Sequence, residues 1–145
     1  KLLTPGMEDY LEMIYRNIQT EGYMRINILS RLLNVKPSSA TKMVQKLAAL
    51  GLVDYRKYGI IFLTEKGKKY GNFLLERHKV VERFLKNIGI TENLLTETEL
   101  IEHNLSINTM QNLDLLNKFL EKNPNVLEEF RKYKEDQEKQ DRQKG

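Results

Sequence analysis

The sequence contains no cysteine among its 145 residues. Disulfide bonds, thiolate catalysis and the cysteine-rich zinc modules are therefore excluded, and any metal site must use oxygen and nitrogen ligands. The chain also lacks an apolar run near the ~18 residues that a membrane-spanning helix needs, and no signal-peptide pattern opens it. We therefore expect a cytoplasmic protein with no membrane partner.

Charge is spread unevenly along the chain, whose hydrophobic content of 40% and charged content of 30% are those of a soluble globular protein. Residues 1–70 hold 12 Lys and Arg against 6 Asp and Glu, whereas residues 71–145 hold 12 against 14. A basic first half favours a polyanionic partner. The alternative is a basic surface that is merely solvated.

The first half shows the helical spacing of apolar residues in three successive segments. A first helix is expected over residues 8–19, a second over residues 26–34 and a third from Pro37. Pro37 suits the first position of a helix, and Ser38 and Ser39 offer hydroxyl caps. Only about four residues join the second and third helices, as a helix-turn-helix requires.

The third helix has an apolar face and a polar face. The apolar face consists of Ala40, Met43, Val44, Leu47 and Leu50. The polar face consists of Ser38, Thr41, Lys42, Gln45 and Lys46. Such a face can contact base edges and phosphates in the major groove, where lysine suits phosphate or guanine and glutamine suits adenine.

A β-hairpin is expected directly after the third helix, which Gly51 ends. Its strands cover residues 52–55 and 60–63, and its basic, aromatic tip would lie along the DNA backbone or minor groove as a wing. The candidate DNA contacts are Ser38, Ser39, Thr41, Lys42, Gln45, Lys46, Arg56, Lys57 and Tyr58. The alternative is a small helical domain with ordinary basic surface residues.

The second half is predicted to be entirely helical. A long helix capped by Thr64 runs to Gly89, and its apolar stripe includes His78. Shorter helices are expected at 98–105, 109–120 and 125–133. Residues 134–145 are almost all charged or glutamine, so we expect this tail to fray into solvent.

The predicted fold is therefore mainly α with a small β-hairpin wing. A winged helix-turn-helix would occupy residues 1–71 and a helical domain residues 72–145. The boundary would fall near Gly71, within the long helix.

The second candidate site consists of acidic and histidine side chains. Glu99, Glu102 and His103 are spaced i, i+3, i+4, which places them within about 100° on a helix. Asp9 and Glu12 repeat the i, i+3 spacing. If these residues converge with His78, four carboxylates and two imidazoles suffice for two divalent ions.

Oxygen ligands with some imidazole suit Mn²⁺ or Fe²⁺, although Zn²⁺ or Co²⁺ could bind more tightly in vitro. The alternative is a hydrogen-bonded core histidine beside acidic residues on exposed helix faces.

Five segments together carry a resemblance to a known family. They are MEDYLE at 7–12, PSSATKMVQKL at 37–47, LTEKG at 63–67, RH at 77–78 and ELIEH at 99–103. In this order they resemble the manganese transport regulators, within the diphtheria-toxin-repressor family of metal-dependent repressors. The resemblance implies a homodimer with a winged-helix DNA-binding domain and a helical dimerisation and metal-binding domain. The dimer would bind palindromic operator DNA near metal-uptake genes when Mn²⁺ is plentiful.

The resemblance also implies a binuclear Mn²⁺ site in each subunit. The matching ligand positions are Asp9, Glu12, His78, Glu99, Glu102 and His103. Iron-responsive relatives use a sulfur ligand where Glu102 stands, so this set suits a harder ion, with Fe²⁺, Co²⁺, Zn²⁺ or Cd²⁺ as possible substitutes. By the same resemblance we expect no SH3-like third domain of the kind that the iron-type members carry.

Two other functions compete with a metal-dependent repressor. The first is a winged-helix regulator that responds to a small organic ligand or to nothing. The second is a binuclear metallohydrolase, since carboxylate-bridged metal pairs also activate water. We expect no enzyme, because the sequence shows neither a separate nucleophile nor a phosphate-cradling loop.

Overall fold

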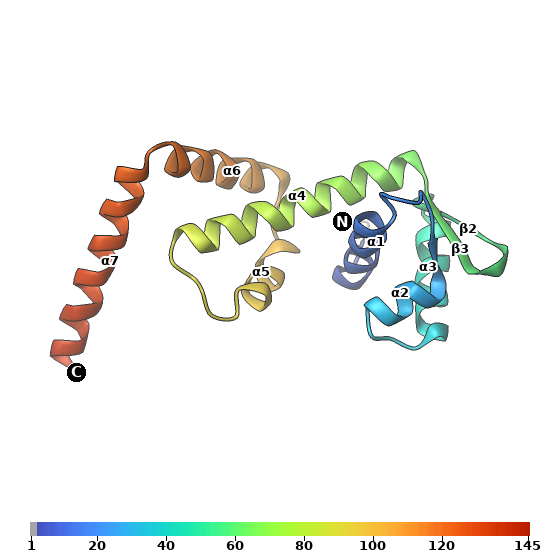
Figure 1. Cartoon of the computed structure of the whole chain (residues 1–145), viewed down its shortest axis with the longest axis horizontal. Coiled ribbons are helices and arrows are strands. Elements are labelled where there is room, and N and C mark those ends of the chain that lie inside the picture. Colours follow the sequence, from blue (N-terminus) through green and yellow to red (C-terminus); the bar gives the residue numbers. More distant parts are fainter. Residues whose placement is uncertain (1–2) are drawn as a thin grey trace. The chain divides into compact units, whose positions relative to one another are not determined.

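A computed structural model describes residues 3–145 and divides the chain into two compact units, Lys1–Glu76 and Arg77–Gly145. Helix α4 (Glu65–Asn87) begins in the first unit and ends in the second (Figure 1). The predicted fold class, mainly helical with a small β wing, is confirmed. None of the helices formed by residues 3–145 combines the length and apolar character needed to cross a bilayer.

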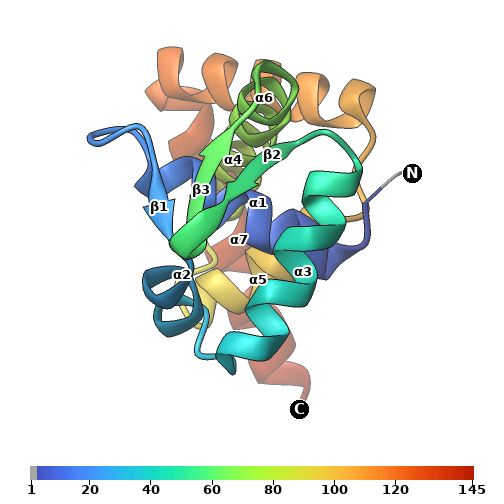
Figure 2. The same ribbon diagram turned by 90° about the vertical axis from the view of Figure 1, so that its right-hand side faces the viewer.

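The first unit is a helix-turn-helix with a three-stranded antiparallel sheet. Before α4 its elements are α1 (Pro5–Asn17), β1 (Met24–Arg25), α2 (Ile26–Leu32), α3 (Pro37–Ala49), β2 (Val53–Arg56) and β3 (Ile60–Leu63). Strand β3 lies between β1 and β2, as Figure 2 shows. The sequence did not predict β1, because two residues are too few to show an alternating pattern.

The apolar face predicted for the third helix is confirmed. Ala40, Val44 and Leu47 are completely buried, and they share one core with Leu11 of α1 and Leu29 of α2. Burial of this face fixes the rotation of α3 about its own axis. The opposite, polar face of α3 must therefore point outward.

The start of α3 differs from the prediction in one detail. Pro37 occupies the first helical position, so the cap position falls on Lys36, which makes no side-chain cap hydrogen bond. The prediction that Ser38 and Ser39 cap the helix is wrong, because both lie inside its first turn. Their hydroxyl groups are exposed to solvent.

The start of α4 is fixed against the β2–β3 hairpin by Thr64. The Thr64 hydroxyl donates to the Gly51 carbonyl at 2.6 Å and accepts from the Gly67 N–H at 3.0 Å, which confirms the predicted cap. The backbone of Gly67 lies so close to Leu52 that an added Cβ would overlap the Leu52 carbonyl oxygen. Glycine at this position therefore allows the helix to begin directly on the hairpin.

We expect Gly67→Ala to lower the free energy of unfolding by about 1–3 kcal/mol, the usual cost of overpacking. Alanine would ordinarily stabilise a helix relative to glycine by roughly 0.5–1 kcal/mol. The matched control is Gly6→Ala in α1, where the new Cβ would meet Met43 Cε at an ordinary 3.7 Å. Urea denaturation measures both variants, and equal stability of the two would contradict the close approach.

The second unit contains the end of α4 with α5 (Leu94–Glu102), α6 (Ile107–Lys122) and α7 (Pro124–Lys144) (Figure 1). Hydrogen bonds of polar side chains join α6 to α4. The buried Asn117 donates to the Val80 carbonyl at 3.0 Å and accepts from Asn87 at 3.2 Å. Beside it, Arg83 donates to Glu121 at 2.7 Å and thereby lowers the pKa of that carboxyl group.

Two helix boundaries in the second unit differ from the prediction. Helix α5 begins at Leu94 and ends at Glu102, earlier at both ends than the predicted 98–105. The prediction of a frayed tail is wrong, because α7 continues to Lys144. Its Lys, Glu, Gln and Arg residues are good helix formers whatever their charge, and Lys134 donates to the Ile88 carbonyl at 3.2 Å.

Candidate metal centre and nucleic-acid interface

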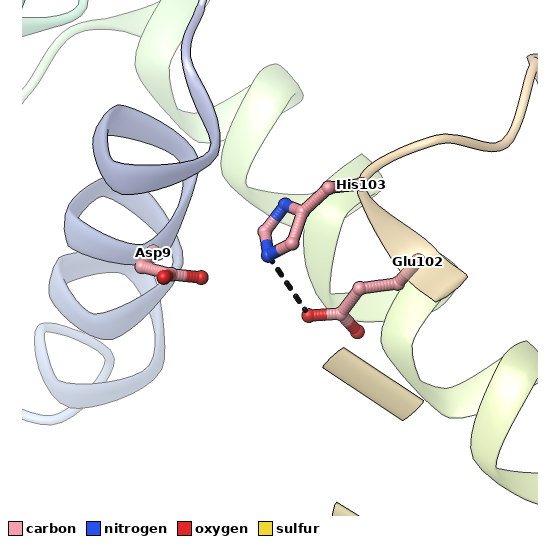
Figure 3. A group of neighbouring side chains, drawn as sticks. All are labelled: Asp9, Glu102 and His103. Carbon is pink, nitrogen blue, oxygen red and sulfur yellow. Dashed lines mark ion pairs between the residues drawn. The ribbon is translucent and has the colours of Figure 1, made fainter. Parts of the chain in front are cut away.

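The buried carboxylate of Glu102 lies between two imidazoles in the second unit. It is 2% exposed, at the last residue of α5. His78 Nδ1 lies 2.6 Å from Glu102 Oε2. His103 Nε2 lies 3.6 Å from Glu102 Oε1 (Figure 3). An ionised carboxylate out of water requires charged or hydrogen-bonding partners, which these rings supply.

The second ring nitrogen of His78 faces another carboxylate. His78 Nε2 lies 3.5 Å from Glu82 Oε2, one helical turn further along α4. Lys86 donates to Glu82 at 3.1 Å, and this hydrogen bond is the main cause that lowers the pKa of Glu82. His78 therefore has a carboxylate at each nitrogen, as expected for a residue in an acidic site rather than in an apolar core.

His103 also contacts a buried arginine. Arg77 is 2% exposed, and its guanidinium Nη2 lies 3.3 Å from His103 Nδ1. His103 itself is 8% exposed and forms the C-cap of α5. Arg77 and Glu82 were both missed by the sequence analysis. Only the i, i+4 spacing from His78 could have indicated Glu82.

The remaining predicted ligands lie on two helices. Asp9 and Glu12 occur one turn apart on α1, where Asp9 is exposed and Glu12 is half-buried. Glu12 forms an ion pair with Arg16 at 2.6 Å. Glu99 is exposed on α5.

The residues of the second unit fit a divalent cation. Ligand atoms of Glu102 lie within 4.8 Å of those of His103, and likewise of those of His78. Among the described residues, the groupings around Glu102 do not include Glu99. Buried carboxylate and imidazole donors without sulfur suit Mn²⁺, Fe²⁺ or Zn²⁺ by their chemistry.

The exposed face of α3 presents the predicted polar side chains. Ser38, Ser39, Lys42, Gln45 and Lys46 are exposed and Thr41 is half-buried. None of these positions is needed for the core. The face is therefore free to contact a ligand as large as a DNA groove.

The hairpin tip combines one restrained and two projecting side chains. Arg56 pairs with Asp54 at 2.9 Å, and its guanidinium lies 4.4 Å from the centre of the Phe62 ring. Lys57 is exposed, and Tyr58 is 89% exposed with a left-handed φ of 65°. The predicted basic, aromatic tip is confirmed.

Two family models match the chain. "Iron dependent repressor, N-terminal DNA binding domain" matches residues 2–61. "Iron dependent repressor, metal binding and dimerisation domain" matches residues 64–131. Together they cover most of the chain, and the second includes α5 and its candidate ligands.

Individual proteins and structures are also similar. A protein named HTH-type transcriptional regulator MntR, from Oceanobacillus iheyensis, is 48% identical over 118 residues, 80% of this chain and 80% of that protein. The structure of ScaR with bound Zn²⁺ matches with a TM-score of 0.66 and 30% identity over 78% of this chain and 54% of its own. The structure of the manganese regulator SloR matches with a TM-score of 0.68 and 30% identity over 82% of this chain and 55% of its own. This chain therefore spans about half the length of those two structures.

Proposed function

We infer that this chain, a member of the iron-dependent repressor family, is a manganese-responsive transcriptional repressor that binds DNA as a homodimer. Its membership rests on the two matching family models and on the MntR relative, and it confirms the resemblance predicted from the sequence. One observation carries the function, the buried Glu102 between the imidazoles of His78 and His103. This cluster lies in the segment matched by the metal-binding domain model.

Manganese is favoured by ligand chemistry and by relatives. The donors are hard oxygens and imidazoles, and a set without sulfur suits Mn²⁺ better than softer ions. The similar SloR structure is named as a manganese regulator, and ScaR has been solved with Zn²⁺ and Cd²⁺. We therefore propose Mn²⁺ as the natural ion, with Fe²⁺, Co²⁺, Zn²⁺ and Cd²⁺ as substitutes in vitro.

We propose that each subunit binds two Mn²⁺ ions. The proposed ligands are Asp9, Glu12, His78, Glu99, Glu102 and His103. Bound Mn²⁺ would supply positive charge that offsets the clustered carboxylates. Because Asp9 and Glu12 belong to the first unit and the other four to the second, filling the site would tie a DNA-binding domain at 1–71 to a dimerisation domain at 72–145.

Such a link would couple metal binding to DNA binding. Two recognition helices of a dimer read a palindromic operator only when their spacing matches half-sites about one helical turn, or a multiple, apart. A fixed joint between the two domains would hold that spacing. By linkage, operator DNA would in turn tighten metal binding. We propose that the operators lie beside metal-uptake genes and that the protein acts in the cytoplasm.

The family consists of transcription regulators, so the metallohydrolase alternative is set aside and the chain is not an enzyme. A winged-helix regulator without metal dependence would leave the acidic cluster with no functional role. The metal titration below separates that alternative from the proposal.

Glu102→Gln should weaken Mn²⁺ binding by roughly 10- to 100-fold, since even outer-shell partners of a metal contribute that much. The amide keeps the shape of the side chain but removes the charge. Calorimetry with Mn²⁺ measures affinity and stoichiometry, and a gel shift with a duplex selected from a random library measures DNA binding. The selection is carried out with Mn²⁺ present.

The matched control for this variant is Glu97→Gln, an exposed carboxylate on the same helix. It should bind Mn²⁺ and DNA as the wild type does. The same change at Glu99 tests whether that exposed residue also binds metal. DNA binding by Glu102→Gln that stays fully Mn²⁺-dependent would contradict the proposed site.

The exposed face of α3 generates a second prediction. Lys42→Ala should weaken DNA binding nearly uniformly across sequences. It should also reduce the slope of log affinity against log salt concentration by about one, which corresponds to the loss of one phosphate contact. Gln45→Ala should reduce the DNA-binding free energy by about 1–3 kcal/mol and relax the preference for one particular base pair. Fluorescence anisotropy over a range of salt concentrations measures both effects.

Neither α3 variant should change the Mn²⁺ stoichiometry, because both side chains are exposed and point away from the core. Lys132→Ala, which removes an exposed lysine from α7, is the control for loss of one positive charge. If it weakens DNA binding as much as Lys42→Ala does, the face of α3 is not the reading surface.

Exposed apolar side chains in the second unit are candidates for the homodimer contact. They include Leu115, Leu116 and Phe119 on α6, which are 62%, 41% and 52% exposed. Contiguous apolar surface of this kind usually marks an interaction site. The dimerisation domain model covers this helix, so we propose that a second copy of the chain covers these residues.

Phe119→Glu should raise the dimer dissociation constant by about tenfold or more, because a charge would be buried at the contact. Sedimentation velocity at several concentrations measures the change. Ile28→Glu, the same substitution at a 41% exposed residue of α2, is the control and should leave the dimer intact. Unchanged association of Phe119→Glu would place the dimer contact elsewhere.

A further inference from the structure

The contact between Arg77 and His103 determines which ring nitrogen of His103 carries its proton. A guanidinium has only donors and stays charged at any pH the protein meets. Arg77 Nη2 lies 3.3 Å from His103 Nδ1. His103 Nδ1 must therefore accept this hydrogen bond, and the proton of the neutral ring must be on Nε2.

The Nε2 atom of His103 faces the candidate metal centre. It lies 3.6 Å from Glu102 Oε1, and the ring presents this edge to the carboxylate (Figure 3). A metal ion binds to a lone pair on an imidazole nitrogen. If Nδ1 accepts from Arg77, the proton of the neutral ring is on Nε2, so neither nitrogen has a free lone pair for a metal ion.

This arrangement is the reverse of the usual surroundings of a metal-bound histidine. Such a histidine almost always donates its other ring N–H to a carboxylate, a carbonyl or water, which fixes the tautomer that leaves the ligating nitrogen bare. Here the neighbour of Nδ1 is a donor, not an acceptor. Arg77 thus stabilises the tautomer that cannot bind metal through Nε2.

We propose that Arg77 is a positioning residue that holds His103 in its Nε2-protonated tautomer and must release Nδ1 before His103 can bind a metal ion. For binding through Nε2, the Nε2 proton passes to solvent and another proton is taken up at Nδ1. One proton leaves and one is taken up, so the ring is neutral before and after the exchange. The lost Arg77 contact then lowers the metal affinity of the site, and so raises the metal concentration at which the protein responds.

The variants Arg77→Gln and Arg77→Lys separate this role from simple burial of a polar side chain. Glutamine has a carbonyl oxygen that can accept from Nδ1–H, whereas lysine, like arginine, can only donate. Arg77→Gln should therefore favour the metal-ready tautomer and tighten Cd²⁺ and Mn²⁺ binding by about tenfold, the lower end of outer-shell effects. Arg77→Lys should leave both the tautomer and the affinity close to those of the wild type.

Nitrogen-15 NMR of the imidazole rings reads the tautomer directly. The chain has only two histidines, so the signals are simple to assign. In the metal-free wild-type protein, His103 should show a protonated Nε2 and an unprotonated Nδ1. His78 serves as the internal reference, because carboxylates rather than an arginine face its two nitrogens. Adding diamagnetic Cd²⁺ should then make Nδ1 of His103 the protonated atom.

A metal-free wild-type His103 protonated at Nδ1 would overturn the inference, and that spectrum is informative even if a variant fails to fold. Arg77→Gln that folds, by circular dichroism, yet keeps the wild-type tautomer and affinity would overturn it as well. The inference rests on the proposed metal site, which the same spectra test separately. If Cd²⁺ shifts neither histidine of the wild-type protein, the metal site itself is wrong.

Discussion

The buried carboxylate of Glu102 is the group on which the second unit depends. An ionised carboxylate removed from water costs several kcal/mol unless charged or donor groups surround it. His78 provides the shortest of these contacts, at 2.6 Å, and that contact joins α5 to α4 across 24 residues of sequence. The packing of α5 against α4 is therefore organised around a buried carboxyl group that needs polar partners. The two imidazoles lie beside it, and the proposed divalent ion would be a further partner.

Much of the first unit could be predicted from sequence because its signals are local. Apolar residues recur at the helical period in α1, α2 and α3, and Gly51, Thr64 and Gly89 mark where helices end or begin. The missed and wrong predictions also have physical causes. Strand β1 has two residues and exists only through its pairing with β3. The serines after Pro37 look like caps, but the proline shifts the cap position back to Lys36.

The candidate site was only partly predictable. The spacing of Glu102 and His103 indicated two neighbouring side chains, and the structure places His103 Nε2 3.6 Å from Glu102 Oε1. The position of His78 in an apolar stripe indicated its burial. Arg77 gave no signal, because its contact with His103 joins residues 26 apart and depends on tertiary structure. The tail was misjudged because a run of charges was taken as a sign of disorder. Lys, Glu, Gln and Arg also favour helices, and Lys134 donates to the carbonyl of Ile88, directly after α4.

The contacts of Arg56 at the hairpin have a consequence for the entropy of the proposed DNA binding. A surface arginine normally samples many rotamers, and ordering one on binding costs about 0.5–1.5 kcal/mol. Here the ion pair with Asp54 and the ring of Phe62 already restrict the side chain. The hairpin therefore carries one restrained arginine beside the exposed Lys57 and the projecting Tyr58. If the proposed wing meets a phosphate, this restrained side chain would lose less conformational entropy than an unrestrained surface arginine would.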